Sequence, residues 1–288
     1  MPETAAHVEK ILGNISLPSC PAILMSITSE ARKEEPDFNL IADMVSSDAG
    51  VSASVLKLVN SPAFRRSTNI ASIKQAVAIL GLKKVMLAVN AMFLRNSVSS
   101  THPTARAFLE KFWEKSSHTA TTAMRLAKLL PGVSEDDAYT LGLFHDSGIP
   151  ILMQRFPDHT FSDALHGGKW ENIHHHEEAK LGTNHAIVGH LLARNWGLPA
   201  HISQTILHHH DIGVFRDPDH PVSSEVRNFI AVLMLAEHLV GIFMETEDKS
   251  ALGKNPAHAH AFEHLGLEHD EFTDIANDIW MDLGQGRA

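Results

Sequence analysis

Apolar residues recur at helical spacing in one segment of this chain after another, and this pattern limits the possible folds more than any other feature. Asp37 suits the N-cap of a helix, and the apolar residues behind it are Leu40, Ile41, Met44 and Val45. No run of alternating β-branched residues is long enough to indicate a sheet. The sequence therefore predicts an all-α protein, a multi-helix bundle.

Capping signals mark the ends of several of these helices. Ser72 and Gln75 form a capping box, and Gly81 is placed to end the same helix. Ser134 begins a weaker box, and Pro199 lies in a first turn, where its missing N–H is tolerated. These signals divide the chain into many short helices.

The distribution of polar and histidine residues suggests two lobes. We expect an N-terminal helical lobe over residues 1–100 and a second lobe over residues 101–288, joined by the polar stretch 97–105. Because this connection is short, the lobes are expected to form one composite unit.

Charge and cysteine content exclude several classes of protein. A net charge of −10 argues against a general binder of nucleic acid or anionic membrane, because affinity for phosphate needs a surplus of Lys and Arg. The single cysteine, Cys20, excludes an internal disulfide and a thiolate metal site. The N-terminus lacks the pattern of a signal peptide, and no apolar run of about 18 residues is evident. We expect a soluble, cytoplasmic protein.

The unusual residue is histidine, with 21 in 288 residues. Histidine is the commonest metal ligand and titrates near neutral pH, so its excess invites the hypothesis of a functional site. Many of these residues lie in polar surroundings and are expected on the solvated surface: His174, His175, His176, His258, His260, His264 and His269.

Five segments bring His, Asp or Glu to faces that are expected to be buried. His145 and Asp146 end an apolar run, where both would be costly without partners. Glu114 and His118 are i and i+4 on one helix, with Cβ atoms about 6 Å apart, so they can share a metal. The other segments contain His185, the run His208 to Asp211, and Glu237. Imidazole with carboxylate suits Fe, Mn, Zn or Ni.

The order of these residues, H…HD…H…HH…acid, resembles the HD superfamily of metal-dependent phosphohydrolases. The segments "DAGVSASVLKLVNS", "IASIKQAVAILG" and "GTNHAIVGHLLARNWGLPAHISQTILHHH" resemble more closely one branch, the HDOD family. The resemblance covers roughly residues 12–265. It implies an HD-like fold and a role in bacterial signalling and regulation.

The resemblance also implies a set of metal ligands and a cofactor. When this sequence is matched position by position to the metal-binding HD phosphodiesterases that it resembles, the implied ligands are Glu114, His118, His145, Asp146, His185, His209, His210 and Glu237. Asp146 would bridge two metals and be the catalytic residue if the protein is active. The implied cofactor is one or two divalent transition metals, Fe, Mn, Ni or Zn.

Two departures weigh against catalysis. Ile149 stands where the cyclic-dinucleotide phosphodiesterases have a Lys that would hold the scissile phosphate, and "DIGVFRDP" replaces their "GYP" loop. A substitute charge could come from Arg155, Lys180 or Arg194.

Three hypotheses remain open. The first is a regulatory module that keeps a metal-filled or ligand-binding pocket and acts through other signalling proteins or a small phosphorylated ligand, without binding nucleic acid or membrane. The second is an active metal-dependent phosphohydrolase. The third is an empty, merely structural histidine cluster.

Overall fold

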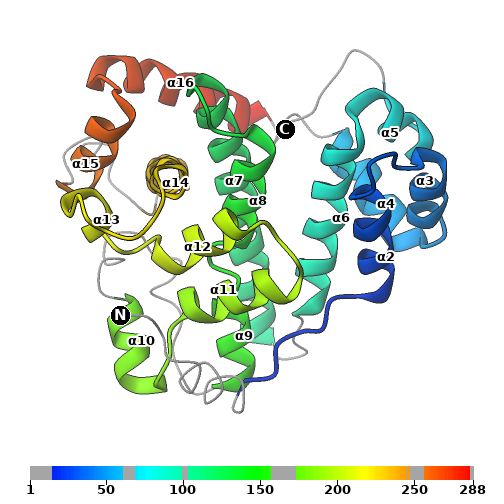
Figure 1. Cartoon of the computed structure of the whole chain (residues 1–288), viewed down its shortest axis with the longest axis horizontal. Coiled ribbons are helices and arrows are strands. Elements are labelled where there is room, and N and C mark those ends of the chain that lie inside the picture. The colour runs from blue at the N-terminus through cyan, green and yellow to red at the C-terminus, as the bar shows by residue number, and fades with distance from the viewer. Residues whose placement is uncertain are drawn as a thin grey trace. The chain divides into compact units, whose positions relative to one another are not determined.

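The computed structural model describes residues 15–60, 69–98, 103–156, 173–244, 246 and 256–285. Within these ranges the chain forms helices and no strand, which confirms the prediction of an all-α fold. The chain divides into two compact units (Figure 1). We call residues 20–99 with 277–288 the N-terminal unit, and residues 1–19 with 100–276 the histidine unit.

The N-terminal unit contains short helices whose ends follow the predicted caps. Its helices are α2 (Ala22–Ala31), α3 (Phe38–Ser46), α4 (Ala49–Val59), α5 (Ile73–Leu80) and α6 (Leu82–Ser97). The Asp37 carboxylate accepts the first free backbone amides of α3, and Ser72 accepts the amide of Gln75 at the start of α5. Gly81 ends α5 with φ of +81°, a conformation that glycine adopts without strain.

The histidine unit is built around long helices that pack side by side. Its helices are α7 (Pro103–Leu129), α8 (Glu135–Phe144), α9 (Gly148–Arg155), α10 (Ile173–Leu181), α11 (His185–Asn195), α12 (Ala200–His208), α13 (Gly213–Arg216), α14 (Ser224–Phe243) and α15 (Pro256–Leu265). Helix α7 packs against α8 and α14, while α11 packs against α9 and α12. The last helix, α16 (His269–Gln285), contributes residues to both units. Of the predicted connection 97–105, residues 99–102 lie outside the described ranges.

Two glycines allow the close approach of helices that carry the functional residues. A Cβ on Gly142 of α8 would lie 2.6 Å from the Ala120 Cα of α7. A Cβ on Gly148, at the start of α9, would lie 2.0 Å from the backbone oxygen of His185, at the start of α11. Both distances are too short for any side chain, so these positions require glycine. The second contact brings the beginnings of α9 and α11 together.

Helix α14 differs from the sequence expectation that no apolar run is long enough to cross a membrane. Its 20 residues are long and apolar enough by composition, but 72% of the apolar window is buried inside the structure. Such burial is typical of a core helix, and Figure 1 shows α14 nearly end-on, with α12 and α15 close by.

The histidines expected on the surface do not all lie there. His258 is buried, and its ring centroid lies 4.1 Å from that of His238, so the expectation was wrong for this residue. His174 is half-buried and stacks on His210 at 5.3 Å. Exposed residues in this group are His175, His176 and His264; His260 is partly exposed, and the side chain of His269 lies outside what the structure describes.

Candidate metal centre

The predicted pair His145 and Asp146 lies at the junction between α8 and α9, in the interior of the histidine unit. His145 follows the last residue of α8, and its backbone N–H donates to the Leu141 carbonyl, so the helix turn continues into the pair. Both side chains are buried, with residue exposures of 1% and 2%. A buried carboxylate and imidazole need partners, and these come from four other segments.

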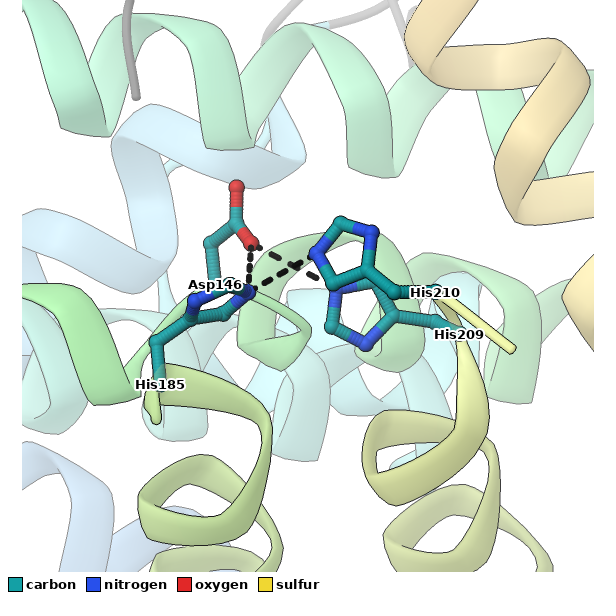
Figure 2. A group of neighbouring side chains, drawn as sticks. All are labelled: Asp146, His185, His209 and His210. Carbon is teal, nitrogen blue, oxygen red and sulfur yellow. Dashed lines mark hydrogen bonds and ion pairs between the residues drawn. The ribbon is translucent and has the colours of Figure 1, made fainter. Parts of the chain in front are cut away.

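Four residues converge on one point (Figure 2): Asp146, His185, His209 and His210. The Asp146 Oδ1 atom lies 3.6 Å from the Nε2 atoms of both His185 and His209. The Nε2 atoms of His185 and His210 lie 2.9 Å apart. Ligands that share one ion through bonds of about 2.1 Å are spaced by roughly 3.0–3.5 Å. The geometry therefore fits a single metal ion, and we call these four residues the histidine site.

The tautomers of two imidazoles are fixed by backbone carbonyls. His145 Nδ1 lies 2.8 Å from the Gly142 carbonyl oxygen, and His209 Nδ1 lies 2.7 Å from that of Ile206. Each Nδ1–H donates to its carbonyl, so in the neutral ring the lone pair on Nε2 points into the cluster. This second-layer hydrogen bond is typical of metal-ligating histidine.

His185 is oriented by Glu177, which the sequence analysis did not single out. Glu177 lies on α10 and is buried; its Oε2 atom accepts the His185 backbone N–H at 2.8 Å and the Nδ1–H at 2.6 Å. One carboxylate oxygen thereby fixes both the start of α11 and the imidazole. Burial lowers the pKa of His185, but the Glu177 carboxylate outweighs it, and the net pKa is raised.

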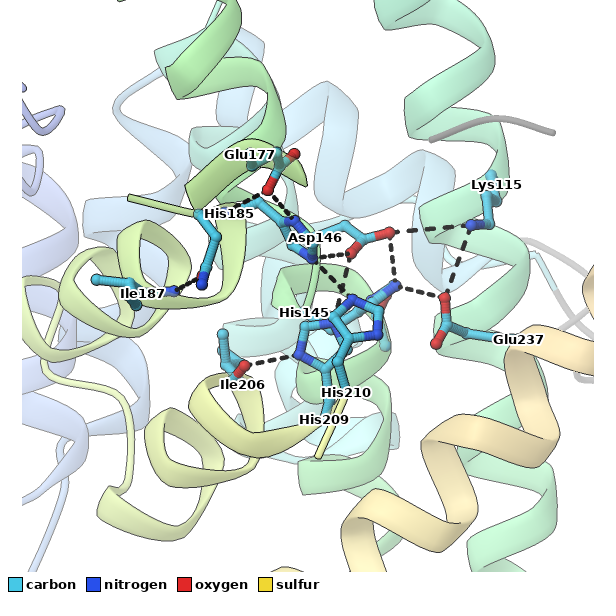
Figure 3. A network of polar contacts seen from close by, with 12 residues as sticks. Lys115, His145, Asp146, Glu177, His185, Ile187, Ile206, His209, His210 and Glu237 are labelled. Atoms are coloured by element: carbon cyan, nitrogen blue, oxygen red, sulfur yellow. Dashed lines mark hydrogen bonds and ion pairs between the residues drawn. The ribbon is translucent and has the colours of Figure 1, made fainter. Parts of the chain in front are cut away.

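A second group of possible ligands shares Asp146. The Nε2 atom of His145 lies 3.1 Å from Asp146 Oδ2 and 3.3 Å from Glu237 Oε1 (Figure 3). His145, Asp146 and Glu237 lie close enough to hold an ion, and we call them the carboxylate site. Here the structure adds a cation that the sequence analysis missed: the Nζ atom of Lys115 lies 3.6 Å from Glu237 Oε1 and 3.9 Å from Asp146 Oδ2.

Charges within the carboxylate site stabilise one another. Burial lowers the pKa of His145, but the carboxylates of Asp146 and Glu237 outweigh this effect and raise it to about 10. Burial raises the pKa of both carboxyls, and the charge of His145, helped by Lys115, lowers them below their usual range. In the metal-free protein at neutral pH, the site therefore holds two cations and two anions.

Several atoms of the two sites are buried without a hydrogen bond to any described residue. They are His145 Nε2, Asp146 Oδ1, His209 Nε2 and Glu237 Oε1. Burial, followed by the neighbouring imidazoles, also holds the pKa of His210 well below its usual range, so its ring is neutral. These buried nitrogen and oxygen atoms lack hydrogen bonds and face one another, so a metal ion bound between them would supply the missing partner.

The predicted ligands Glu114 and His118 contact each other. They are 3.8 Å apart on α7, and His118 also packs its ring against Phe243 at 5.3 Å. Among the described residues, neither belongs to a group with metal-ligand spacing. The intervening Lys115 points into the carboxylate site instead, because the buried face of α7 passes through positions 112, 115, 116 and 119.

The position of the missing basic residue and its possible substitutes can be located in the structure. Ile149 is fully buried beside the site, so no charge comes from that position. Arg155, Lys180 and Arg194 are exposed. The ammonium group of Lys115, in contrast, is buried and lies 3.9 Å from Asp146 Oδ2.

Comparison with known proteins extends these observations. An uncharacterized protein of Treponema pallidum (strain Nichols) is 26% identical over 204 residues, which is 68% of this chain and 38% of the relative. This chain thus spans well under half of that protein. A candidate phosphohydrolase of Shewanella amazonensis SB2B superposes with a TM-score of 0.71 over 99% of both chains, at 22% identity.

An HDOD domain protein of unknown function from Geobacter sulfurreducens superposes with a TM-score of 0.63 over 95% of both chains, again at 22% identity. At such identities the likeness shows the HD-like fold alone. The sequence profile of the HDOD domain matches residues 17–212 of this chain, which include both the capped N-terminal helices and the histidine site. The chain therefore belongs to the HDOD domain family.

Proposed function

We propose that this protein is a signal-transduction module that holds one divalent transition metal in the histidine site and does not turn over phosphodiesters rapidly. The observation that carries the proposal is the position of Lys115, whose ammonium lies within 4 Å of a carboxylate oxygen on both Asp146 and Glu237.

A two-metal hydrolytic centre needs a second ion near the first, about 3.5–4 Å away, to activate water and stabilise the leaving oxygen. The carboxylate site is where the second ion would bind, since it shares Asp146 with the histidine site. Lys115 already neutralises these carboxylates and would repel a divalent cation there. The arrangement therefore supports one metal, at the histidine site.

Turnover also needs a positive group that stabilises charge on the phosphoryl oxygens, and such a preorganised group contributes several kcal/mol. The position expected for it holds Ile149. The second candidate function, an active phosphohydrolase, rests on the same Lys115. If a substrate phosphate replaced one carboxylate beside Lys115, its ammonium group would supply the positive charge that stabilises the phosphoryl oxygens.

The remaining parts of the proposal follow from family membership and charge. The module acts in the cytoplasm of a bacterium, through other signalling proteins or a small phosphorylated ligand. The net charge of −10 supports a role without nucleic acid or membrane binding.

Turnover assays with matched variants test the proposal. Metal-replete protein is incubated with cyclic dinucleotides, nucleoside mono- and triphosphates and an aryl phosphodiester, with Asp146→Ala as the blank. We expect turnover far below about 1 s⁻¹, an ordinary low enzyme rate. A higher rate that disappears in both Asp146→Ala and Lys115→Met would establish the hydrolase instead.

A further inference from the structure

A third group of potential ligands lies outside the sites described above. His208 ends α12, Asp211 follows in the next turn, and His220 lies between α13 and α14. One ligand atom from each lies within 4.8 Å of the other two. Asp211 Oδ2 is 3.3 Å from His220 Nε2 and 4.0 Å from His208 Nδ1.

The Asp211 carboxylate is held in a defined orientation. Its Oδ1 atom accepts the backbone N–H of Gly213 at 2.8 Å, which leaves Oδ2 directed at the imidazoles. A Cβ at position 213 would lie 2.8 Å from Oδ1, so the absence of a side chain permits this bond. A carboxylate whose second oxygen is tied to the backbone is a typical preorganised metal ligand.

We propose that His208, Asp211 and His220 form a separate binding site for a divalent transition metal, of which Zn²⁺ is the best match. Two imidazoles and one carboxylate are a ligand set that Zn²⁺ uses, with a fourth position left to water. The spacings of 3.3 and 4.0 Å are close to the roughly 3.4 Å between ligands around a tetrahedral ion. Asp211 is exposed, so an ion can enter from solvent.

The proposed site is separate from the histidine site, although His209 and His210 lie between His208 and Asp211 in the sequence. His209 and His210 direct their Nε2 atoms toward Asp146 or His185, whereas His208 and His220 face Asp211. The turn after α12 thus presents ligands in two directions. An ion in the new site would join the end of α12 to the segment that precedes α14.

Metal binding at the proposed site gives up one hydrogen bond of His220. The Val222 backbone N–H donates to His220 Nδ1 at 3.4 Å, so in the metal-free protein the proton of this ring is on Nε2, facing Asp211. Binding at Nε2 moves the proton to Nδ1 and gives up that long hydrogen bond. Because Asp211 is also exposed, the proposed site exchanges its metal with solvent.

Calorimetric titration of tag-free protein with Zn²⁺ tests the site by comparing wild type with two site variants and one control variant. Asp211→Asn keeps the shape and the acceptor for Gly213 but lacks the charge; His220→Gln removes an imidazole. His201→Gln is the matched control, because His201 also faces two carboxylates, Asp137 at 3.2 Å and Glu225 at 3.8 Å, without a second imidazole in a metal-ligand group.

We expect wild type and His201→Gln to bind one Zn²⁺ equivalent more than Asp211→Asn and His220→Gln, or to bind that equivalent at least tenfold more tightly. Crystals soaked in Zn²⁺ should show an anomalous peak between the three side chains. Equal Zn²⁺ binding by wild type and both site variants would overturn the proposal. Because it concerns residues outside the histidine site, this result is independent of the proposed regulatory function.

Discussion

Replacing Lys115 by Met removes one of the two cations of the carboxylate site, while most of the buried stem is kept. Two unit charges about 4 Å apart interact by about 4 kcal/mol at an effective dielectric constant of about 20, and Lys115 has two such contacts, at 3.6 and 3.9 Å. Desolvation offsets much of this attraction. Breaking a buried ion pair typically costs about 3–5 kcal/mol, because the remaining charge is left uncompensated.

We therefore expect metal-free Lys115→Met to lose about 3 kcal/mol of stability, equivalent to roughly 6–12 °C in Tm. The same substitution removes one of the charges that repel a second ion. Added Mn²⁺ or Zn²⁺ should therefore restore more stability to this variant than it adds to wild type, since a ligand at 100 times its Kd contributes about 2.7 kcal/mol. Thermal unfolding with and without metal, after chelator treatment, measures both effects.

Lys111→Met is the matched control, because Lys111 lies one turn earlier on α7 and is exposed. It should stay within about 0.5 kcal/mol of wild type, as usual for surface substitutions. If Lys115→Met is as stable as this control without metal, Lys115 does not stabilise the carboxylate site. If metal stabilises Lys115→Met no more than wild type, Lys115 does not exclude a second ion.

Three further predictions concern the surroundings of the site. Glu177→Gln weakens the hydrogen bond that orients the His185 ring, so it should lower metal affinity by about 10–100-fold, as measured in competition with a chelator. Unchanged affinity would contradict the role of Glu177 in orienting His185. Burial, then the neighbouring imidazole, lowers the pKa of His258 to about 3. The unfolded chain therefore takes up a proton below about pH 6.5 while the folded chain does not. The contribution of this residue to the free energy of unfolding is complete above that pH and falls by about 2 kcal/mol at pH 5. His258→Phe should remove this loss, as measured by urea unfolding at both pH values. Equal losses in wild type and His258→Phe would contradict the prediction. Gly148→Ala should destabilise by several kcal/mol, because its Cβ would lie 2.0 Å from a backbone oxygen. Gly189→Ala should be milder, because its Cβ would lie 3.1 Å from a side-chain methyl and no closer than 3.4 Å to the backbone of another residue. Equal effects would argue against the close contact of α9 and α11.

Much of the fold is encoded locally and was therefore predictable from sequence. Asp37, Ser72 and Gly81 act on backbone groups within a few residues, so their roles as caps do not depend on distant parts of the chain. The pair His145–Asp146 was identified because two polar residues at the end of an apolar run need partners. His258 shows the limit, because its burial depends on packing against α14, which the polar surroundings of residue 258 do not reveal.

Lys115 and Glu177 were missed for different reasons. The spacing of Glu114 and His118 drew attention away from Lys115, although Phe112, Lys115 and Thr119 share one buried stripe that the helical period could have revealed. Glu177 follows three histidines in a polar segment with no apolar periodicity. Its burial arises only when α10 meets the start of α11, so no local signal indicated it.

The occupancy of the two sites that share Asp146 tests the account most directly. Crystals of wild-type protein grown with Mn²⁺ and measured near the manganese edge would place each ion by its anomalous scattering. We predict one peak among Asp146, His185, His209 and His210, with Lys115 still against Asp146 and Glu237. A second peak among His145, Asp146 and Glu237, with Lys115 displaced, would contradict it.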